Sequence, residues 1–196
     1  MKTFEEYLHL AALAHGHMCA GQVLGIRLAM HGLSLLGLDD PTGKDRKRLV
    51  TFVEIDRCAT DAIGLVTGCR LGKRSLKFMD FGKMAATFCD LQTGLAVRVV
   101  ARETSRERAK ELYPDIEDKN EQQLKAYKEM AAEDLFAIHW VKVHVPPQEM
   151  PGFKGARIVC VRCGEGISFQ RELIMDGQAV CRSCAGDRYY HPMAPQ

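Results

Sequence analysis

Two Cys-x-x-Cys pairs near the end of this chain constrain its folding more than any other feature. The first pair is Cys160 and Cys163, the second is Cys181 and Cys184, and seventeen residues separate the pairs. Two residues between cysteines let both sulfurs of a tight turn reach one ion, and this separation is typical of a four-cysteine zinc site. We therefore expect a closed, structural zinc site here, with a disulfide pair or an accident of composition as the alternatives.

The composition is that of an ordinary globular protein. The 196 residues are 46% hydrophobic and 27% charged, and this length favours one core domain with a small appendage. The first six residues include two glutamates, where a secretory signal would be basic and then apolar, and no apolar run is long enough to span a bilayer. We therefore expect a cytoplasmic protein without a membrane partner, whose cysteines serve metals or catalysis rather than disulfides.

Hydrophobic periodicity predicts an α+β core. A helical pattern over residues 4–38 is interrupted near Gly16, and Asp56 is suited to cap a helix over residues 58–69. Thr104 and Glu107 form a capping box that opens a further helix. The other predicted elements are strands at 49–55, 76–80, 84–90, 95–101 and 138–145 and a helix at 117–132.

Turn residues divide these elements. The sequence of residues 80–83, Asp-Phe-Gly-Lys, predicts a hairpin between the second and third strands. Prolines and a glycine punctuate residues 145–152, which we interpret as a linker. The chain is thus expected to form a core domain over residues 1–147 and a zinc domain over residues 153–196.

A second cluster of metal-type ligands lies near the start of the chain, where His15, His17 and Cys19 fall within five positions. Imidazole nitrogen and thiolate sulfur are favoured ligands of zinc, nickel and iron. In a continuous helix His15 and Cys19 would share a face. If Gly16 breaks the helix, His17 and Cys19 can converge at the start of the next one. Either arrangement predicts a second site that holds a divalent ion or performs catalysis.

The junction at residues 54–61 is expected to supply the rest of that site, because ligands and catalytic groups gather where strand ends meet helix starts. Cys58 is a further candidate metal ligand. The candidate catalytic residues are Cys19, Asp56, Asp61 and Lys73, of which Lys73 could pair with an anionic ligand. The competing interpretations are a helix cap for Asp56 and a packed small residue for Cys58.

Four motifs of this sequence occur together in one known family. They are His15-Gly-His17-x-Cys19-x-Gly21, Glu54-x-Asp56-x-Cys58-x-x-Asp61-Ala62, Thr67-Gly68-Cys69 with Gly72-Lys73, and Asp80-x-Gly82-Lys83. Together they resemble the FmdE family, named for the FmdE component of the molybdenum or tungsten formylmethanofuran dehydrogenase. The resemblance covers nearly the whole chain, including the cysteine pairs, which form a treble-clef zinc finger in some members. Ala20 departs from the pattern, since a proline is expected after the cysteine.

The resemblance implies an α+β core related in topology to a glyceraldehyde-3-phosphate-dehydrogenase-like domain, with helices on a mostly antiparallel sheet. It also implies an intertwined homodimer and a core pocket for a small-molecule ligand around the histidine-cysteine motif. The formylmethanofuran reaction belongs to a different, pterin-metal component of that enzyme. We therefore expect either an accessory component of a larger oxidoreductase complex or a stand-alone metal-site protein of one-carbon metabolism.

Two other functions compete with this interpretation. A zinc finger can read nucleic acid, but from residue 154 onward six basic residues stand against four acids, and this excess is too mild for strong phosphate-driven binding. Nucleic acid is therefore not the expected partner. A thiol redox protein could instead use one Cys-x-x-Cys pair, and its cysteines would then react with thiol reagents without a chelator.

Overall fold

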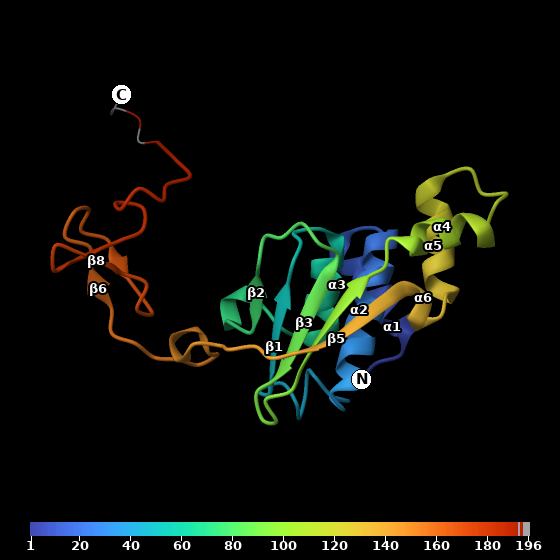
Figure 1. Cartoon of the computed structure of the whole chain (residues 1–196), viewed down its shortest axis with the longest axis horizontal. Helices are drawn as coiled ribbons and strands as arrows, with labels where there is room; N and C mark the ends of the chain where they lie inside the picture. The colour runs from blue at the N-terminus through green and yellow to red at the C-terminus, as the bar shows by residue number, and fades with distance from the viewer. Residues whose placement is uncertain (192, 194–196) are drawn as a thin grey trace. The chain divides into compact units, whose positions relative to one another are not determined.

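The computed structural model describes residues 1–191 and 193, and the chain divides into two compact units between His144 and Val145 (Figure 1). We call residues Met1–His144 the core unit and residues Val145–Gln196 the finger unit. The domain limits expected from the sequence, 1–147 and 153–196, stay predictions. Residues 192 and 194–196 of the second domain lie outside the described residues.

The core unit is built on a five-stranded sheet in the order β2-β1-β3-β4-β5. Its strands are β1 (Leu49–Val53), β2 (Leu76–Phe78), β3 (Ala85–Asp90), β4 (Ala96–Ala101) and β5 (Phe136–Val141). β1 and β2 are parallel, and the other three pairings are antiparallel. The α+β class with a mostly antiparallel sheet is therefore confirmed.

The hairpin predicted at residues 80–83 is wrong, because β1 lies between β2 and β3. The backbone N–H of Met79 donates to the carbonyl of Val53 at 2.9 Å, and that of Lys83 donates to the carbonyl of Glu54 at 3.0 Å. The segment between β2 and β3 therefore wraps around the end of β1 instead of folding back on itself. The sequence shows a turn there, but a turn signal does not say which strand the chain joins next.

The two N-terminal helices come from one helical pattern that Gly16 interrupts. They are α1 (Phe4–His15) and α2 (Ala20–Leu35). Gly16 ends α1 with a positive φ of 87°, and its N–H donates to the carbonyl of Ala12; glycine reaches this left-handed conformation without strain. Cys19 is the N-cap of α2, and its side chain makes no capping hydrogen bond. The predicted break is therefore confirmed, and Cys19 stands at the start of the second helix.

Two predicted helix caps are wrong. Helix α3 (Cys58–Thr67) has Arg57 as its N-cap, so Asp56 lies one position too early to cap it. Helix α4 (Thr104–Leu112) already includes Thr104, and its N-cap is Glu103, whose φ and ψ of −63° and −31° are helical. The chain therefore enters the helical turn before Thr104, and the predicted capping box does not form.

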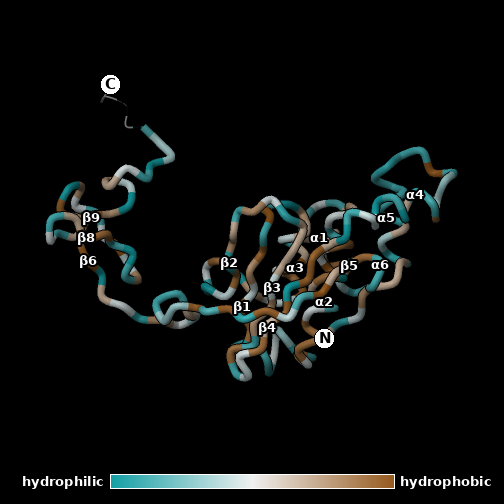
Figure 2. The backbone as a smooth tube through the Cα atoms, viewed as in Figure 1, coloured by the Kyte–Doolittle hydropathy of each residue, from teal (hydrophilic) through white to brown (hydrophobic). Residues whose placement is uncertain are grey.

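The later helices are α5 (Lys119–Glu129) and α6 (Ala132–Leu135). Figure 2 shows a hydrophilic backbone along α4 and α5, in contrast to the hydrophobic strands of the sheet. One side of these helices is nevertheless buried, since Ala109, Ala126 and Tyr127 belong to the main hydrophobic core. Across the described residues, no helix has both the length and the apolar character to cross a membrane.

α2 packs closely against both α3 and the sheet. A Cβ atom at Gly25 would lie 2.4 Å from the carbonyl oxygen of Ala59, and one at Gly32 would lie 2.3 Å from the ring of Phe88. Neither distance leaves room for a side chain, so the two glycines set how near α2 approaches its neighbours. This packing fixes the start of α2 against the start of α3.

The finger unit consists of two short hairpins after the single helical turn η2 (Pro147–Glu149). Its strands are β6 (Ile158–Val159), β7 (Gly166–Ile167), β8 (Leu173–Met175) and β9 (Gln178–Val180). Asp176 and Gly177 both have positive φ, at 50° and 75°, as a two-residue hairpin turn requires. Within the described part of this unit, the buried hydrophobic cluster contains only Cys160, Ile167 and Val180.

Candidate metal centres and adjoining cavities

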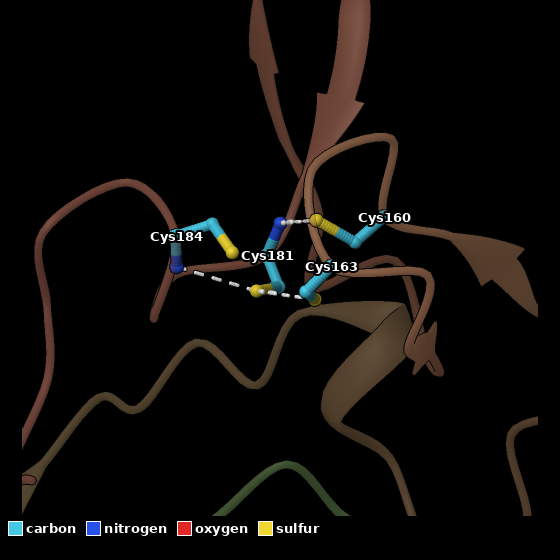
Figure 3. A group of neighbouring side chains, drawn as sticks. All are labelled: Cys160, Cys163, Cys181 and Cys184. Atoms are coloured by element: carbon cyan, nitrogen blue, oxygen red, sulfur yellow. Dashed lines mark hydrogen bonds between the residues drawn. The ribbon is translucent and has the colours of Figure 1, made fainter. Parts of the chain in front are cut away.

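The four finger cysteines converge on one point. Cys160 and Cys163 lie in the turn between β6 and β7, and Cys181 and Cys184 follow β9 (Figure 3). Their four sulfur atoms all lie within 4.8 Å of one another, and the Sγ atoms of Cys163 and Cys181 are 3.8 Å apart. Zinc–sulfur bonds of about 2.3 Å in a tetrahedron place sulfurs about 3.8 Å apart. The donor set therefore fits one zinc ion.

Backbone N–H groups donate to two of these sulfurs, while neighbouring thiols help to raise the pKa of Cys163 and Cys184. The N–H of Cys181 donates to Cys160 Sγ at 3.3 Å, and the N–H of Cys184 donates to Cys181 Sγ at 3.3 Å. The bond from Cys181 is the main cause that lowers the pKa of the Cys160 thiol to about 6. A thiol with this pKa is largely ionised at neutral pH, and the thiolate is the form that binds metal.

His15, His17 and Cys19 form a second group of metal-type ligands in the core unit. One ligand atom from each lies within 4.8 Å of the others, and the two imidazole rings are 4.9 Å apart between centroids. The group sits in the turn that Gly16 opens between α1 and α2. The continuous helix is wrong, because the helix breaks at Gly16. His17 and Cys19 lie close together at the start of α2, as the other arrangement predicted, and His15 joins them.

Asp61 on α3 holds His15 in place. The Nδ1 atom of His15 lies 3.0 Å from Asp61 Oδ2, so Nε2 is the ring nitrogen left to face an ion. Metal-ligating histidines commonly donate their second ring N–H to a carboxylate, which fixes the orientation of the ring. The contact between His15 and Asp61 therefore has the arrangement expected of a metal-ligating histidine.

Cys58 lies beside this group but does not complete it. Burial and a hydrogen bond with Cys19 raise the pKa of the Cys58 thiol, so the two thiols are neighbours. Among the residues that the structure describes, the close group nevertheless contains only His15, His17 and Cys19. A Cβ atom at Gly21 would lie 3.4 Å from Cys58 Cβ and 3.8 Å from Cys19 Sγ. The lack of a side chain at Gly21 therefore leaves space between the two cysteines.

Two cavities adjoin the contact between His15 and Asp61. Their volumes are about 520 Å³ and 480 Å³, within the range of roughly 300–1,000 Å³ typical of small-molecule sites. The residues that line both cavities are His15, Thr60, Asp61, Leu71 and Leu76. The two cavities therefore share a wall that contains one of the candidate metal ligands.

The other candidate residues are distributed unevenly around these cavities. Asp56 and Cys58 line the second cavity. Lys73 lies in the helical turn η1 (Leu71–Lys73) and lines neither of them. Gln22 lines the first cavity and was not predicted. Its only signal in the sequence is one amide within the otherwise apolar start of α2, which is too weak to single it out.

Comparisons with known proteins agree with these features. The model of the family described as "FmdE, Molybdenum formylmethanofuran dehydrogenase operon" matches residues 14–138. The model described as "Prokaryotic dksA/traR C4-type zinc finger" matches residues 154–190. The four-cysteine cluster is therefore a structural zinc site, as predicted, and not a disulfide pair.

Two individual proteins are also similar. A protein of Archaeoglobus fulgidus named "Probable S-adenosyl-L-methionine-binding protein" is 30% identical over 89% of this chain, and the chain spans 51% of that relative's length. The crystal structure of a tungsten formylmethanofuran dehydrogenase FmdE-like protein from Syntrophus aciditrophicus has a TM-score of 0.66 at 23% identity. That match covers 97% of this chain and 96% of the other, and it shows a shared fold. This chain is a metal-binding member of the FmdE family with a C-terminal C4 zinc finger.

Proposed function

We propose that the core unit binds a second divalent ion through His15, His17 and Cys19 and a small organic ligand in the cavities beside it. The observation that carries this proposal is the convergence of three soft or borderline ligands at a helix break, next to cavities that share His15 as a wall residue. Three protein ligands leave a fourth position of a tetrahedral ion open, which distinguishes a reactive site from a structural one.

The ligand set favours zinc, nickel or iron over magnesium or calcium, which prefer oxygen ligands. When bound, such an ion supplies a Lewis acid that polarises a group placed at its open position. The chain's own residues would hold and orient that group: Asp61 through His15, and Asp56 and Cys58 from the wall of the second cavity. A role for Lys73 with an anionic ligand remains a prediction.

Membership of the FmdE family supports association with a formylmethanofuran dehydrogenase complex, and we propose this chain as an accessory component rather than its catalytic component. The expected homodimer and the cytoplasmic location also stay predictions. The relative from Archaeoglobus fulgidus is about twice as long as the aligned part, so its named ligand does not transfer directly to this chain. That molecule is therefore one ligand to test rather than the one proposed.

Cobalt substitution tests the proposed open site. Full-length protein loaded with Co²⁺ is expected to show two sets of thiolate-to-cobalt absorption bands, because both ligand groups contain cysteine. Cysteamine, a small thiol, is expected to change only the bands of the core site, since the finger site has four protein ligands and no open position. S-adenosyl-L-methionine is added in a parallel titration.

The variant His17→Ala with Cys19→Ser is expected to keep the finger bands and to lose the response to cysteamine. Cys89→Ala serves as the control, because Cys89 is a buried thiol in β3 that belongs to neither ligand group. The proposal fails if cysteamine leaves the cobalt spectrum of the unmodified protein unchanged, or if the double variant responds as the unmodified protein does.

A further inference from the structure

Gln22 is a buried amide at the wall of the first cavity. It lies on α2, three positions after Cys19, and is 1% exposed. Its Nε2 donates to the carbonyl of Cys58 at 3.4 Å. A flipped amide would place Oε1 against that carbonyl, and two acceptors repel each other. The contact with Cys58 therefore fixes which way the amide points.

The carbonyl oxygen of this amide is left without a partner. Gln22 Oε1 is buried and accepts no hydrogen bond from any described residue. Buried polar atoms in native proteins are nearly always hydrogen-bonded, so an unmatched acceptor requires an explanation. Because Gln22 lines a cavity large enough for a small molecule, a ligand in that cavity is the natural source of the missing donor.

The rest of the wall indicates what kind of molecule would supply this donor. Most of the lining surface is apolar, although Arg70, His15 and Asp61 also line the cavity. Its alanine and leucine side chains are Ala11, Ala14, Ala62, Leu65, Leu71 and Leu76. Two of the polar lining groups already have partners: Cys69 Sγ accepts from the hydroxyl of Thr51 at 3.5 Å, and the hydroxyl of Thr60 donates to the carbonyl of Ile55. Both groups therefore have a hydrogen bond within the protein, whereas Gln22 Oε1 accepts none from the described residues.

We propose that Gln22 is a specificity-determining residue for the core ligand, which is a mostly apolar small molecule with an N–H or O–H group that donates to Gln22 Oε1. This inference rests on the proposed ligand site in the core unit and adds the chemical class of its ligand. A buried acceptor discriminates strongly against an isostere that lacks the donor, because the acceptor then stays unpaired.

Indole and benzofuran test this proposal, since they have nearly the same shape and differ in one ring N–H. Both are titrated into full-length, zinc-loaded protein by calorimetry. Indole is expected to bind about tenfold more tightly, as one net hydrogen bond implies. In Gln22→Met, which keeps the side-chain length, this preference is expected to disappear.

Gln122→Met is the matched control. Gln122 is also a buried glutamine, but its Nε2 donates to the carbonyls of Tyr113 and Ile116, and it lines neither cavity. This variant is expected to keep the preference for indole. Equal affinity of the unmodified protein for the two probes overturns the proposal, as does a preference that persists in Gln22→Met.

Failure of both probes to bind the unmodified protein also overturns the proposal. This outcome is measured on the unmodified protein, so it does not depend on whether a variant at a buried position folds. The metal content measured on the same samples separates this failure from that of the proposed function. If the second ion is present but the protein does not prefer indole, only the proposed role of Gln22 is contradicted. Absence of the second ion contradicts the metal site itself.

Discussion

At the scale of single residues, the contact between His15 and Asp61 connects the ligand cluster to the cavities. His15 belongs to the three-residue ligand group and lines both cavities, while Asp61 reaches it from a different helix. The Asp61 side chain is 68% exposed, and such ion pairs contribute about 0–1 kcal/mol to stability. Its main effect should therefore be on the metal site rather than on folding.

Replacing Asp61→Asn is expected to weaken metal binding at the core site about 10- to 100-fold, as loss of an outer-shell carboxylate typically does. The thermal midpoint should change little. Competition with a chromophoric chelator measures the affinity, and Asp80→Asn, an exposed acid in the segment before β3, is the control. Unchanged affinity in Asp61→Asn would show that the contact with His15 has no role in metal binding.

Asp90, the last residue of β3, is a charged side chain that stabilises the fold. It is almost fully buried and accepts hydrogen bonds from Arg48 Nη2 at 2.6 Å, Gln92 N at 3.0 Å and Thr93 Oγ1 at 2.8 Å. Burial alone would raise the pKa of Asp90, but these bonds together hold it below its ordinary value of 3.8. The carboxylate therefore stabilises the fold in its ionised form.

Asp90→Asn is expected to lower the free energy of unfolding by about 2 kcal/mol at neutral pH. Because the folded-state pKa is depressed, the stabilisation by Asp90 is fully present above the unfolded value and is lost as pH falls through the folded value. Urea unfolding at several pH values should thus show the variant and the unmodified protein converging in strong acid. Asp115→Asn, at an exposed position, should unfold with nearly the same free energy as the unmodified protein. A difference in unfolding free energy between Asp90→Asn and the unmodified protein that stays constant with pH would contradict this account.

At the scale of helices and strands, the close approach of α2 and α3 holds the two halves of the candidate site together. Gly25 permits this approach, because a Cβ atom there would overlap the backbone of Ala59. The four-residue spacing of Gly21 and Gly25 indicates such an approach, but the sequence alone does not name α3 as the partner.

Gly25→Ala is expected to destabilise the protein by about 2 kcal/mol, since an added methyl group must push two helices apart. Gly64→Ala in the middle of α3 is the matched control. A Cβ atom there would only reach ordinary contact, at 3.4 Å from the carbonyl oxygen of Cys69, and alanine favours a helix by up to about 1 kcal/mol. Urea unfolding of both variants measures the difference. A Gly25→Ala protein as stable as Gly64→Ala would contradict the packing described.

Short sequence signals, such as glycines and turn residues, predicted where helices end but not which strands pair. The break at Gly16 and the end of α3 at Gly68 follow from the left-handed conformation that glycine adopts easily. The hairpin at residues 80–83 failed because β2 pairs with β1 after a helical crossover. The role of Asp56 as a cap failed because the helix starts one residue later than the cap requires. Strand partners and helix starts depend on tertiary packing, which a short motif does not encode.

At the scale of the whole molecule, the two units depend on metal to different degrees. The core unit has a large hydrophobic core that includes side chains from α1 to α5 and from the sheet. Among its described residues, the finger unit has only three buried hydrophobic residues, one of which is a zinc ligand. A segment with so little buried apolar surface needs the ion to fold. Spacing alone predicted this site, because both cysteine pairs lie in short turns whose geometry is local.

The core ligand group was harder to predict from the sequence. His15, His17 and Cys19 are close in the chain, but Asp61 contributes because α3 packs near the end of α1, and Gln22 because α2 packs against α3. Lys73 was predicted near the site as a partner for an anionic ligand, and it does not line either cavity. The strand-to-helix junction pointed to Asp61 but not to its contact with His15, and no spacing signal pointed to Gln22.

Metal content per chain, measured by mass spectrometry on unmodified protein and three variants, tests the central claim most directly. The unmodified protein and Cys89→Ala are expected to hold two ions per chain, one for each ligand group. His17→Ala with Cys19→Ser should hold one and keep its far-ultraviolet circular dichroism. Cys160→Ser with Cys163→Ser should also hold one and lose the folded finger. Full metal content in the His17 and Cys19 double variant would contradict the proposal of a second metal centre in the core.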